Sequence, residues 1–221
     1  MATSKELAQY WDSKWEDSPD MADNSWIQIA YSIFDIESEK FQKMLDVGCG
    51  SAENYERYFT EKDGTHRQIV GIDISNTAIR FARENNAGID SFMFEVGDGT
   101  ALRFGDNSFD IVTAFDFLTS TGSAYMTALN EMWRVTNDYM IFNVTHKDLV
   151  APDTLDDVLH LVSLNEREVE GIFMQLSPLP RYSEMRTFTF DEIYNRGHGE
   201  WEHHKTVNGE RNIAILALAR K

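Results

Sequence analysis

A glycine-rich segment near residue 48 joins an apolar run to a stretch with helical spacing. It reads Leu45-Asp46-Val47-Gly48-Cys49-Gly50-Ser51-Ala52. Glycine lets a backbone turn sharply and approach a ligand closely, and a helix start offers free N–H groups to that ligand. The dinucleotide pattern G-x-G-x-x-G requires a third glycine where Glu53 stands, and a carboxylate there would repel a pyrophosphate. The segment therefore predicts a cofactor loop and disfavours NAD and FAD.

Two further acidic residues lie where the next apolar runs end. Asp73 closes the run 70–73, and Asp98 follows Val96 and Gly97. At the end of a strand in an open α/β sheet, a carboxylate can accept both hydroxyls of a ribose, which is the role expected for Asp73. Asp98 is placed to receive an adenine amino group. Asp46, Asp73 and Asp98 are therefore predicted to lie together at the carboxyl ends of three successive strands.

The elements that must position these residues follow a regular alternation from residue 42 onward. Short apolar runs alternate with helical patterns, which predicts an α/β fold with a parallel sheet covered by helices. Strands are expected over 43–47, 68–74, 91–96, 109–115 and 139–144, and helices over 51–61, 77–86 and about 123–134. Ser75 is the expected N-cap of the second of these helices, and Gly88 is expected to end it.

Three regions lie outside this alternation. Residues 1–40 are predicted to form an N-terminal helical cap, and residues 41–145 the cofactor-binding core. Residues 146–190 are predicted to be an insert or lid over the substrate site, with a helix from Pro152 to about Gly171. Residues 191–221 are expected to complete the sheet with a hairpin, formed by strands 201–207 and 212–220 around the turn Asn208-Gly209.

These segments together resemble the S-adenosylmethionine-dependent methyltransferases of the Rossmann-like class. The similarity runs from about 43 to 144 and includes the glycine loop, Gly71-Ile72-Asp73-Ile74-Ser75, Gly97-Asp98 and Asn107-Ser108-Phe109-Asp110-Ile111-Val112. The sequence departs from that family at Ala52, where a third glycine is usual, and at 135–138, which replaces a common proline-glycine-glycine turn.

The resemblance implies a three-layer α/β/α Rossmann-like methyltransferase sheet, mostly parallel, with a C-terminal antiparallel hairpin strand. It implies that the loop surrounds the methionine part of S-adenosylmethionine, that Asp73 holds the ribose, and that Ile74 packs on the adenine. Asp98 with Gly99 would read the adenine edge, and Phe115 would lie near the methionine end. The cofactor residues predicted in this way are Asp46, Gly48, Cys49, Gly50, Asp73, Ile74, Asp98, Gly99 and Phe115.

The activity that the resemblance implies is methyl transfer to an N or O atom of a small molecule. A protein methyltransferase and a non-catalytic S-adenosylmethionine-binding module are the alternatives. The sulfonium already activates the methyl group, so a catalytic base is optional for many acceptors. His146, directly after the fifth strand, is the base hypothesis, and an ordinary strand-end histidine explains it equally well. Asp116, directly after the fourth strand, is expected to contact the substrate.

Three of the five tryptophans lie in the first 40 positions. Tyr10, Trp11, Trp15 and Trp26 are the predicted substrate residues, because they could stack on an aromatic acceptor or surround a cation. Their spacing also fits amphipathic helices that pack an aromatic face against a core. In the resembled family, segments outside the sheet form a lid over the acceptor.

Composition sets the remaining expectations. The chain has 221 residues, 20 basic and 37 acidic, with a formal charge of −17, which argues against a nucleic-acid partner. The absence of a bilayer-length apolar run or a signal-peptide pattern predicts a cytoplasmic protein without a membrane partner. Cys49 is the single cysteine and is interpreted as a small packing residue, not a nucleophile. The spacing of His198, His203 and His204 predicts no metal. The sequence does not reveal the oligomeric state.

Overall fold

The structure is a computed structural model, and it describes residues 3–18, 25–34, 41–53, 55, 67–147, 162–189 and 212–221. Its strands form one mixed sheet in the order β3-β2-β1-β4-β5-β8-β7, and β6 pairs with the end of β5. The strands are β1 (Lys43–Val47), β2 (Gln68–Asp73), β3 (Phe92–Val96), β4 (Phe109–Ala114), β5 (Thr136–His146), β6 (Ser163–Leu164), β7 (Tyr182–Thr189) and β8 (Asn212–Arg220). Strands β1 to β6 pair in parallel, whereas β8 runs antiparallel to both β5 and β7.

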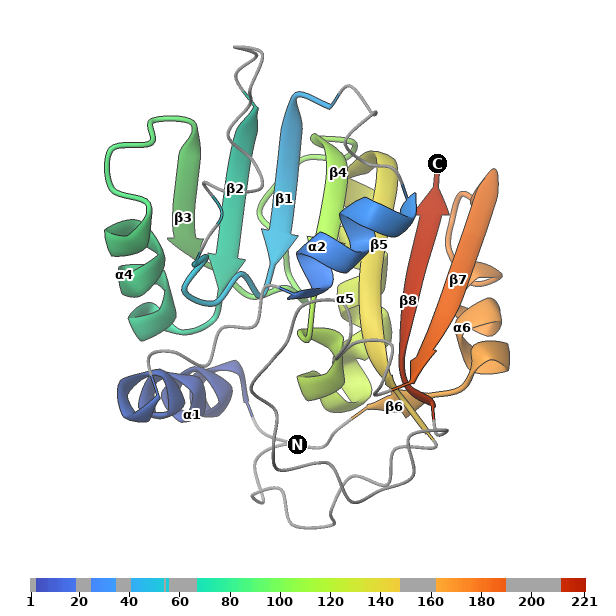
Figure 1. The fold of residues 1–221 in the computed structure, drawn as a ribbon, viewed down its shortest axis with the longest axis horizontal. Helices are drawn as coiled ribbons and strands as arrows, with labels where there is room; N and C mark the ends of the chain where they lie inside the picture. The colour runs from blue at the N-terminus through green and yellow to red at the C-terminus, as the bar shows by residue number, and fades with distance from the viewer. Residues whose placement is uncertain are drawn as a thin grey trace.

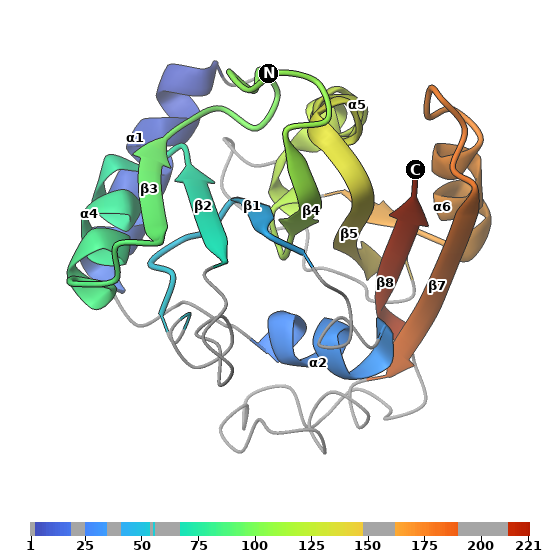
Figure 2. The same ribbon diagram turned by 90° about the horizontal axis from the view of Figure 1, so that it is seen from above.

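Helices cover both faces of the sheet (Figures 1 and 2). The described helices are α1 (Ser4–Asp17), α2 (Ser25–Phe34), α4 (Asn76–Asn85), α5 (Tyr125–Val135) and α6 (Glu166–Phe173), with short 3-10 turns η2 (Leu118–Ser120) and η3 (Gly122–Ala124). One core cluster joins the sheet to α5 and α6, and a second joins its other face to α2 and α4. The predicted three-layer Rossmann-like α/β fold with its C-terminal antiparallel strand is confirmed.

The central strands are apolar because both of their faces are covered. In β1, every residue from Met44 to Val47 is buried, and β4 is buried at Phe109 and from Ile111 to Ala114. The predicted bounds of β1 agree with the structure, and those of β2, β3 and β4 agree to within one residue. Strand β5 begins three residues earlier than predicted, because polar Thr136 pairs with Phe109 of β4.

Helix α4 begins and ends where its capping residues predict. The Ser75 hydroxyl accepts a hydrogen bond from the Ala78 N–H at 3.1 Å, which satisfies one free donor at the helix start. The chain leaves the helix at Asn86, and Gly88 then takes a φ of +92° that favours glycine. The helix thereby starts directly after Asp73, at the edge of the sheet where a ligand is expected.

The region predicted as an insert differs from the expectation. The predicted helix from Pro152 to about Gly171 is wrong beyond residue 162, because Ser163–Leu164 forms β6 and Asn165 caps a new helix, α6. Strand β7 lies within the predicted lid but pairs with β8 along its whole length, so it belongs to the sheet. Residues 51–61 and the predicted strand 201–207 lie largely or wholly outside the described residues.

No helix in the described part of the chain is long and apolar enough to cross a bilayer.

Candidate functional site

The candidate site lies at the carboxyl ends of β1 to β4. The sheet order reverses between β1 and β4, because β2 and β3 extend to one side of β1 and β5 to the other. Ligands of open α/β sheets bind in the crevice outside this point of reversal. The glycine loop follows β1, and Asp116 and Phe117 follow β4, so both sides of the crevice carry residues of interest.

The glycine loop is held in a left-handed turn against the end of β2. Gly48 has a φ of +78° and Gly50 a φ of +53°, a conformation that strains other residues. The N–H groups of Gly48 and Cys49 donate to the Ile72 carbonyl at 2.8 and 3.0 Å. The Gly50 N–H donates to the Asp73 carboxylate at 3.1 Å. The loop and the predicted ribose acid therefore form one connected unit.

Aromatic side chains lie directly against three glycines of the site. A Cβ on Gly48 would stand 2.7 Å from Phe117, and a Cβ on Gly99 would stand 2.5 Å from the far end of the same ring. A Cβ on Gly50 would stand 2.7 Å from the Trp15 ring. These distances are shorter than van der Waals contact, so glycine is required for the close approach at each position. Phe117 spans the crevice from the glycine loop to the end of β3.

Asp46 lies beneath the loop and is 4% exposed. Thr113 donates to one of its carboxylate oxygens at 2.6 Å, and the Tyr55 hydroxyl donates to the other. Burial raises the pKa of Asp46 to about 7, against the opposing effect of the Thr113 hydrogen bond. Through these two hydrogen bonds Asp46 connects the end of β1 to β4 and to Tyr55, directly before the loop.

Asp73 stands at the end of β2 with its carboxylate shared between two elements. One oxygen accepts from the Gly50 N–H and the other from the Ser75 N–H at 2.9 Å. Burial raises the pKa of Asp73 to about 6, although these two backbone hydrogen bonds lower it. A carboxylate oxygen can accept more than one hydrogen bond, so each oxygen keeps capacity for a hydroxyl donor.

Asp98 follows β3 and is ordered by hydrogen bonds at both oxygens. Thr100 donates its N–H and its hydroxyl to one oxygen at 2.8 and 2.6 Å. The Ser4 hydroxyl of α1 donates to the other oxygen at 2.7 Å. Burial opposes ionisation, but these hydrogen bonds hold the pKa of Asp98 below its ordinary value. Asp98 is therefore a preformed anionic acceptor at the mouth of the crevice.

Cys49 points away from the crevice. Its Sγ lies 2.8 Å from where a Cβ on Gly71 would stand, so it fills the space beside β2. Burial raises the pKa of the thiol well above its ordinary value, and the neighbouring Asp73 and Asp46 add to that effect. These contacts agree with the interpretation of Cys49 as a packing residue, which supplies the loop with a backbone N–H and not with a nucleophile.

Asp116 and Asn143 form a reciprocal pair at the end of β4. The Asp116 N–H donates to the Asn143 side-chain oxygen at 2.6 Å, and the Asn143 amide donates back to the Asp116 carboxylate at 2.7 Å. Asn143 is 2% exposed, whereas Asp116 is exposed. Asp116 has a φ of +55°, a region that non-glycine residues avoid and that recurs at functional sites. The buried amide thus holds an exposed carboxylate in a strained position.

His146 lies on the opposite face of β5 from Asn143. Its Nε2 lies 3.2 Å from the Glu166 carboxylate at the start of α6, and Thr187 of β7 donates to the other Glu166 oxygen at 3.0 Å. The histidine is buried, with 4% exposed. Residues 143 and 146 point to opposite faces of a strand, so His146 is directed toward α6 and β7, away from the Asp116 pair.

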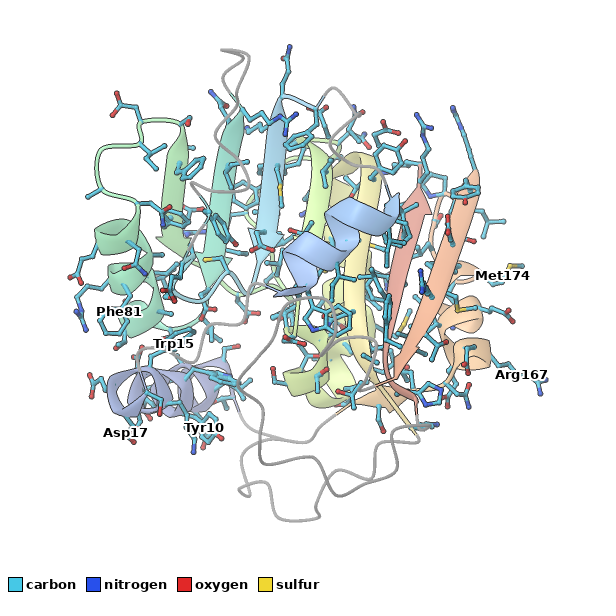
Figure 3. The ribbon with its side chains drawn as sticks, viewed as in Figure 1. Tyr10, Trp15, Asp17, Phe81, Arg167 and Met174 are labelled. Atoms are coloured by element: carbon cyan, nitrogen blue, oxygen red, sulfur yellow. The ribbon has the colours of Figure 1, made fainter. Side chains whose placement is uncertain are left out.

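The predicted aromatic residues are divided between different environments. Trp26 is buried in the core, where its ring packs edge-to-face on Phe188 at 5.7 Å. Figure 3 shows Trp15 on the side of α1 that faces the sheet, and Tyr10 on the far side of that helix. Tyr10 and Trp11 pack on each other at 5.4 Å between ring centroids.

Residues near the carboxyl ends of β2 and β4 complete the predicted set. Ile74 is half-buried directly after Asp73. Phe115, predicted to lie near the methionine end, packs against the core cluster on the α2 side, whereas Phe117 lies against Gly48 and Gly99. Among the described residues, no group of three or more His, Cys, Asp or Glu side chains could hold a metal ion.

Several residues of the site were not predicted from the sequence. Phe117 lies two positions after Phe115, and strand alternation alone does not decide which of the two faces the crevice. Thr113, Tyr55 and Asn143 are partners of predicted residues and have no local signature. Ser4 reaches Asp98 across 94 positions of sequence, so only the fold brings them together.

Comparison with known proteins agrees with this geometry. Residues 38–208 match the sequence model of a protein family described as a methyltransferase domain. The chain belongs to that family. The resemblance to Rossmann-like S-adenosylmethionine-dependent methyltransferases is thereby confirmed.

Individual relatives match over parts of their length. A demethylmenaquinone methyltransferase of Staphylococcus epidermidis is 35% identical over 97 residues, which are 44% of this chain and 39% of that protein. Phosphoethanolamine N-methyltransferase 1 of Arabidopsis thaliana is 45% identical over 76 residues, 34% of this chain and 15% of that protein. The chain thus spans well under half the length of these curated relatives.

A solved structure extends the similarity of fold to the whole chain. Magnesium protoporphyrin IX methyltransferase from Synechocystis PCC 6803 with bound SAH has a TM-score of 0.65 and 16% identity. It covers 99% of this chain and 100% of that chain.

The residues present fit S-adenosylmethionine, the cofactor of this class. Gly48 and Gly50 lack the Cβ that would narrow the crevice beside Phe117 and Trp15, and Asp73 and Asp98 offer carboxylate oxygens to hydroxyl and amino donors. These are the groups that a ribose and an adenine present.

Proposed function

We propose that the protein transfers the methyl group of S-adenosylmethionine to an N or O atom of a small-molecule acceptor. The main support is the connected unit of Gly50 and Asp73 at the point where the sheet order reverses, a hydrogen bond of 3.1 Å that joins loop and acid. The two curated relatives are named as methyltransferases of demethylmenaquinone and of phosphoethanolamine, both small molecules.

The residues of the crevice would act mainly by orientation. Asp73 would bind the ribose hydroxyls and Asp98 the adenine amino group, which fixes the adenosine at two points. When bound, S-adenosylmethionine supplies a methyl group on a sulfonium that is already activated for attack. Alignment of a nucleophile with such a group can lower a barrier by about 7 to 11 kcal/mol. The protein therefore needs to exclude water and to hold the acceptor, more than to activate it.

Asp116 is the residue that we propose for acceptor contact. Its carboxylate is exposed at the end of β4, and Asn143 fixes its position. An anion held there would attract an amine or accept a hydrogen bond from a hydroxyl. His146 stays the hypothesis for a base; its Nε2 lies 3.2 Å from the Glu166 carboxylate, on the opposite face of β5 from Asn143.

Ligand binding provides the first experiment. S-adenosylhomocysteine (SAH) should raise the melting temperature of the protein, since a ligand at 100 times its Kd adds about 2.7 kcal/mol to the free energy of unfolding. Asp73→Asn should lose most of that increase. Failure of both S-adenosylmethionine and SAH to shift the wild-type melting temperature at millimolar concentration would refute the cofactor assignment.

The acceptor class can be tested with a labelled methyl group. We expect label to appear in small molecules, with amines and phenols as the first panel, and not in intact protein. Label in polypeptide would favour a protein methyltransferase, and cofactor binding without any turnover would favour a non-catalytic module.

The composition supports a cytoplasmic location, because a single buried cysteine suits a reducing compartment.

A further inference from the structure

Helix α1 contacts the ends of all three strands that carry predicted cofactor residues. It reaches the loop after β1 through Trp15, the turn after β2 through Asp12, and the end of β3 through Ser4. In Figure 1, α1 lies beyond the arrowheads of β2 and β3 and next to α4. Figure 3 shows Trp15 directed from α1 toward the sheet, whereas Tyr10 and Asp17 point away from it.

Hydrogen bonds fix the position of α1 at two of these points. The Asp12 carboxylate accepts from the Ser75 hydroxyl at 2.7 Å and from the Thr77 N–H at 3.0 Å, so it adds a second cap to α4. The Ser4 hydroxyl donates to Asp98 at 2.7 Å. Both partners adjoin or belong to the predicted adenosine site, because Ser75 is two residues from Asp73.

Trp15 provides the third contact and the apolar surface. Its ring lies 2.7 Å from where a Cβ on Gly50 would stand, and the residue is 6% exposed. A ligand that touches Gly50, Asp73 and Asp98 together must therefore lie against α1. An aromatic ring at that position can cover an adenosine and exclude water from it.

We propose that α1 is the roof of the cofactor pocket, and that Ser4 and Trp15 are cofactor-site residues and not part of the acceptor site. Ser4 holds the Asp98 oxygen that receives the adenine amino group, and the Trp15 ring covers the adenosine beside Gly50. Asp12 anchors the helix in that position. This inference rests on the proposed function, since it names further residues of the same cofactor site.

The test compares the affinity of full-length variants for SAH by isothermal titration calorimetry. Trp15→Ala should raise the Kd about tenfold, and Ser4→Ala about threefold, in line with the loss of an aromatic contact and of one ordering hydrogen bond. Ser13→Ala is the matched control, since Ser13 is an exposed serine of the same helix, and its Kd should equal that of the wild type.

Ser4→Ala is expected to fold like the wild type, so a weaker affinity for SAH in this variant would not result from unfolding. Ser4 is exposed, and the capping box of α1 is formed by Thr3 and Glu6, so the helix start remains intact. The second readout is tryptophan fluorescence, because SAH should change the emission of the wild type and not that of folded Trp15→Phe. A change that persists undiminished in that variant contradicts the contact.

The outcomes separate this proposal from the proposed function. If the wild type binds SAH and both Trp15→Ala and Ser4→Ala bind it equally well, α1 is not part of the pocket. If these variants bind SAH more tightly, α1 competes with the ligand for Asp98 and Gly50, and the roof is likewise refuted. If the wild type itself does not bind SAH, the cofactor assignment is refuted. The proposed role of α1 is then refuted as well, because it depends on that assignment.

Discussion

At the scale of single residues, the site places carboxylates in two opposite electrostatic situations. Burial raises the pKa of Asp46 and of Asp73, to about 7 and about 6. Asp98 is also partly buried, but hydrogen bonds from Thr100 and Ser4 lower its pKa. An anion is therefore ready at the adenine end at all pH values near neutral, whereas the two acids near the glycine loop ionise in the range in which enzymes usually work.

The raised pKa of Asp46 predicts a specific pH dependence of stability. The folded protein keeps a proton on this group between about pH 4 and 7, whereas the unfolded chain loses it, so the free energy of unfolding falls as pH rises through that window. We expect a loss of roughly 2 to 3 kcal/mol between pH 5 and 8 that is absent in Asp46→Asn. Urea unfolding of both proteins at several pH values measures it. Parallel profiles for the two proteins would contradict the prediction.

The hydrogen bonds between Asp116 and Asn143 hold the Asp116 backbone in a strained left-handed conformation. We predict that a double variant releases this strain. Asn143→Ala should lower the free energy of unfolding by about 2 kcal/mol, because a buried hydrogen-bonding partner is lost while Asp116 stays left-handed. Adding Asp116→Gly should restore about 1 kcal/mol, since glycine adopts that conformation without strain.

Asn137→Ala serves as the control for this pair, because Asn137 is an exposed asparagine on the same strand. It should change the free energy of unfolding by less than about 0.5 kcal/mol. Chemical denaturation of all four proteins gives the comparison. If the double variant does not recover stability, the left-handed backbone at Asp116 is not strained.

At the scale of elements, the glycine loop combines a backbone requirement with a requirement for space. Gly48 has both a positive φ and the Phe117 side chain 2.7 Å from its Cβ position. Gly88, after α4, has a φ of +92° with nothing within 4 Å of that position. These two glycines therefore separate the two requirements.

Alanine at each position should measure them. Gly88→Ala should lower the free energy of unfolding by about 1 to 2 kcal/mol through backbone strain alone. Gly48→Ala should lower it by about 1 to 3 kcal/mol more, because the added methyl group displaces the Phe117 side chain. Thermal unfolding monitored by circular dichroism gives both values. Equal losses would show that Phe117 yields to the methyl group without resistance.

The elements also show what the sequence predicts and where it stops. Strands β1 to β4 are continuous apolar runs bounded by turn residues, and their predicted limits agree with the structure. The start of β5 was missed because Thr136, Asn137 and Asp138 are polar, although Thr136 pairs with Phe109. The start of α6 carried a readable signal, since Asn165 and Glu168 form a capping box.

The predicted site residues also divide into those that local sequence patterns reveal and those that depend on tertiary packing. Asp73 and Asp98 stand at strand ends, a position that the pattern of runs reveals, and the structure places them on one crevice with the loop. Trp26 was a predicted substrate residue and lies in the core, because helical spacing does not tell which wall a ring faces. The contacts of α1 depend on tertiary packing and have no local signature.

At the scale of the whole molecule, the protein has a formal net charge of −17, and the crevice itself contains carboxylates. S-adenosylmethionine carries a sulfonium, and SAH lacks that positive charge. The field of the protein should therefore favour the methyl donor over the demethylated product. This difference would assist product release after each turnover.

Salt should reduce that preference. Raising KCl from about 50 to 500 mM should weaken S-adenosylmethionine binding roughly threefold to tenfold and SAH binding less than twofold, because screening acts on the charged ligand. Calorimetric titration with both ligands at each salt concentration tests this. Equal salt dependence of the two affinities would assign the acidic surface to solubility alone.

The position of β8 in the sheet has a consequence for how the protein forms. Strand β8 lies between β5 and β7 and pairs with both, yet it comes later in the chain than either of them. During synthesis the strands β1 to β5, which carry the whole cofactor edge, emerge before β7 and β8. Strand β7 is made before β8, its pairing partner among the described strands. The last strand to be made thus completes both core clusters on which the cofactor edge rests.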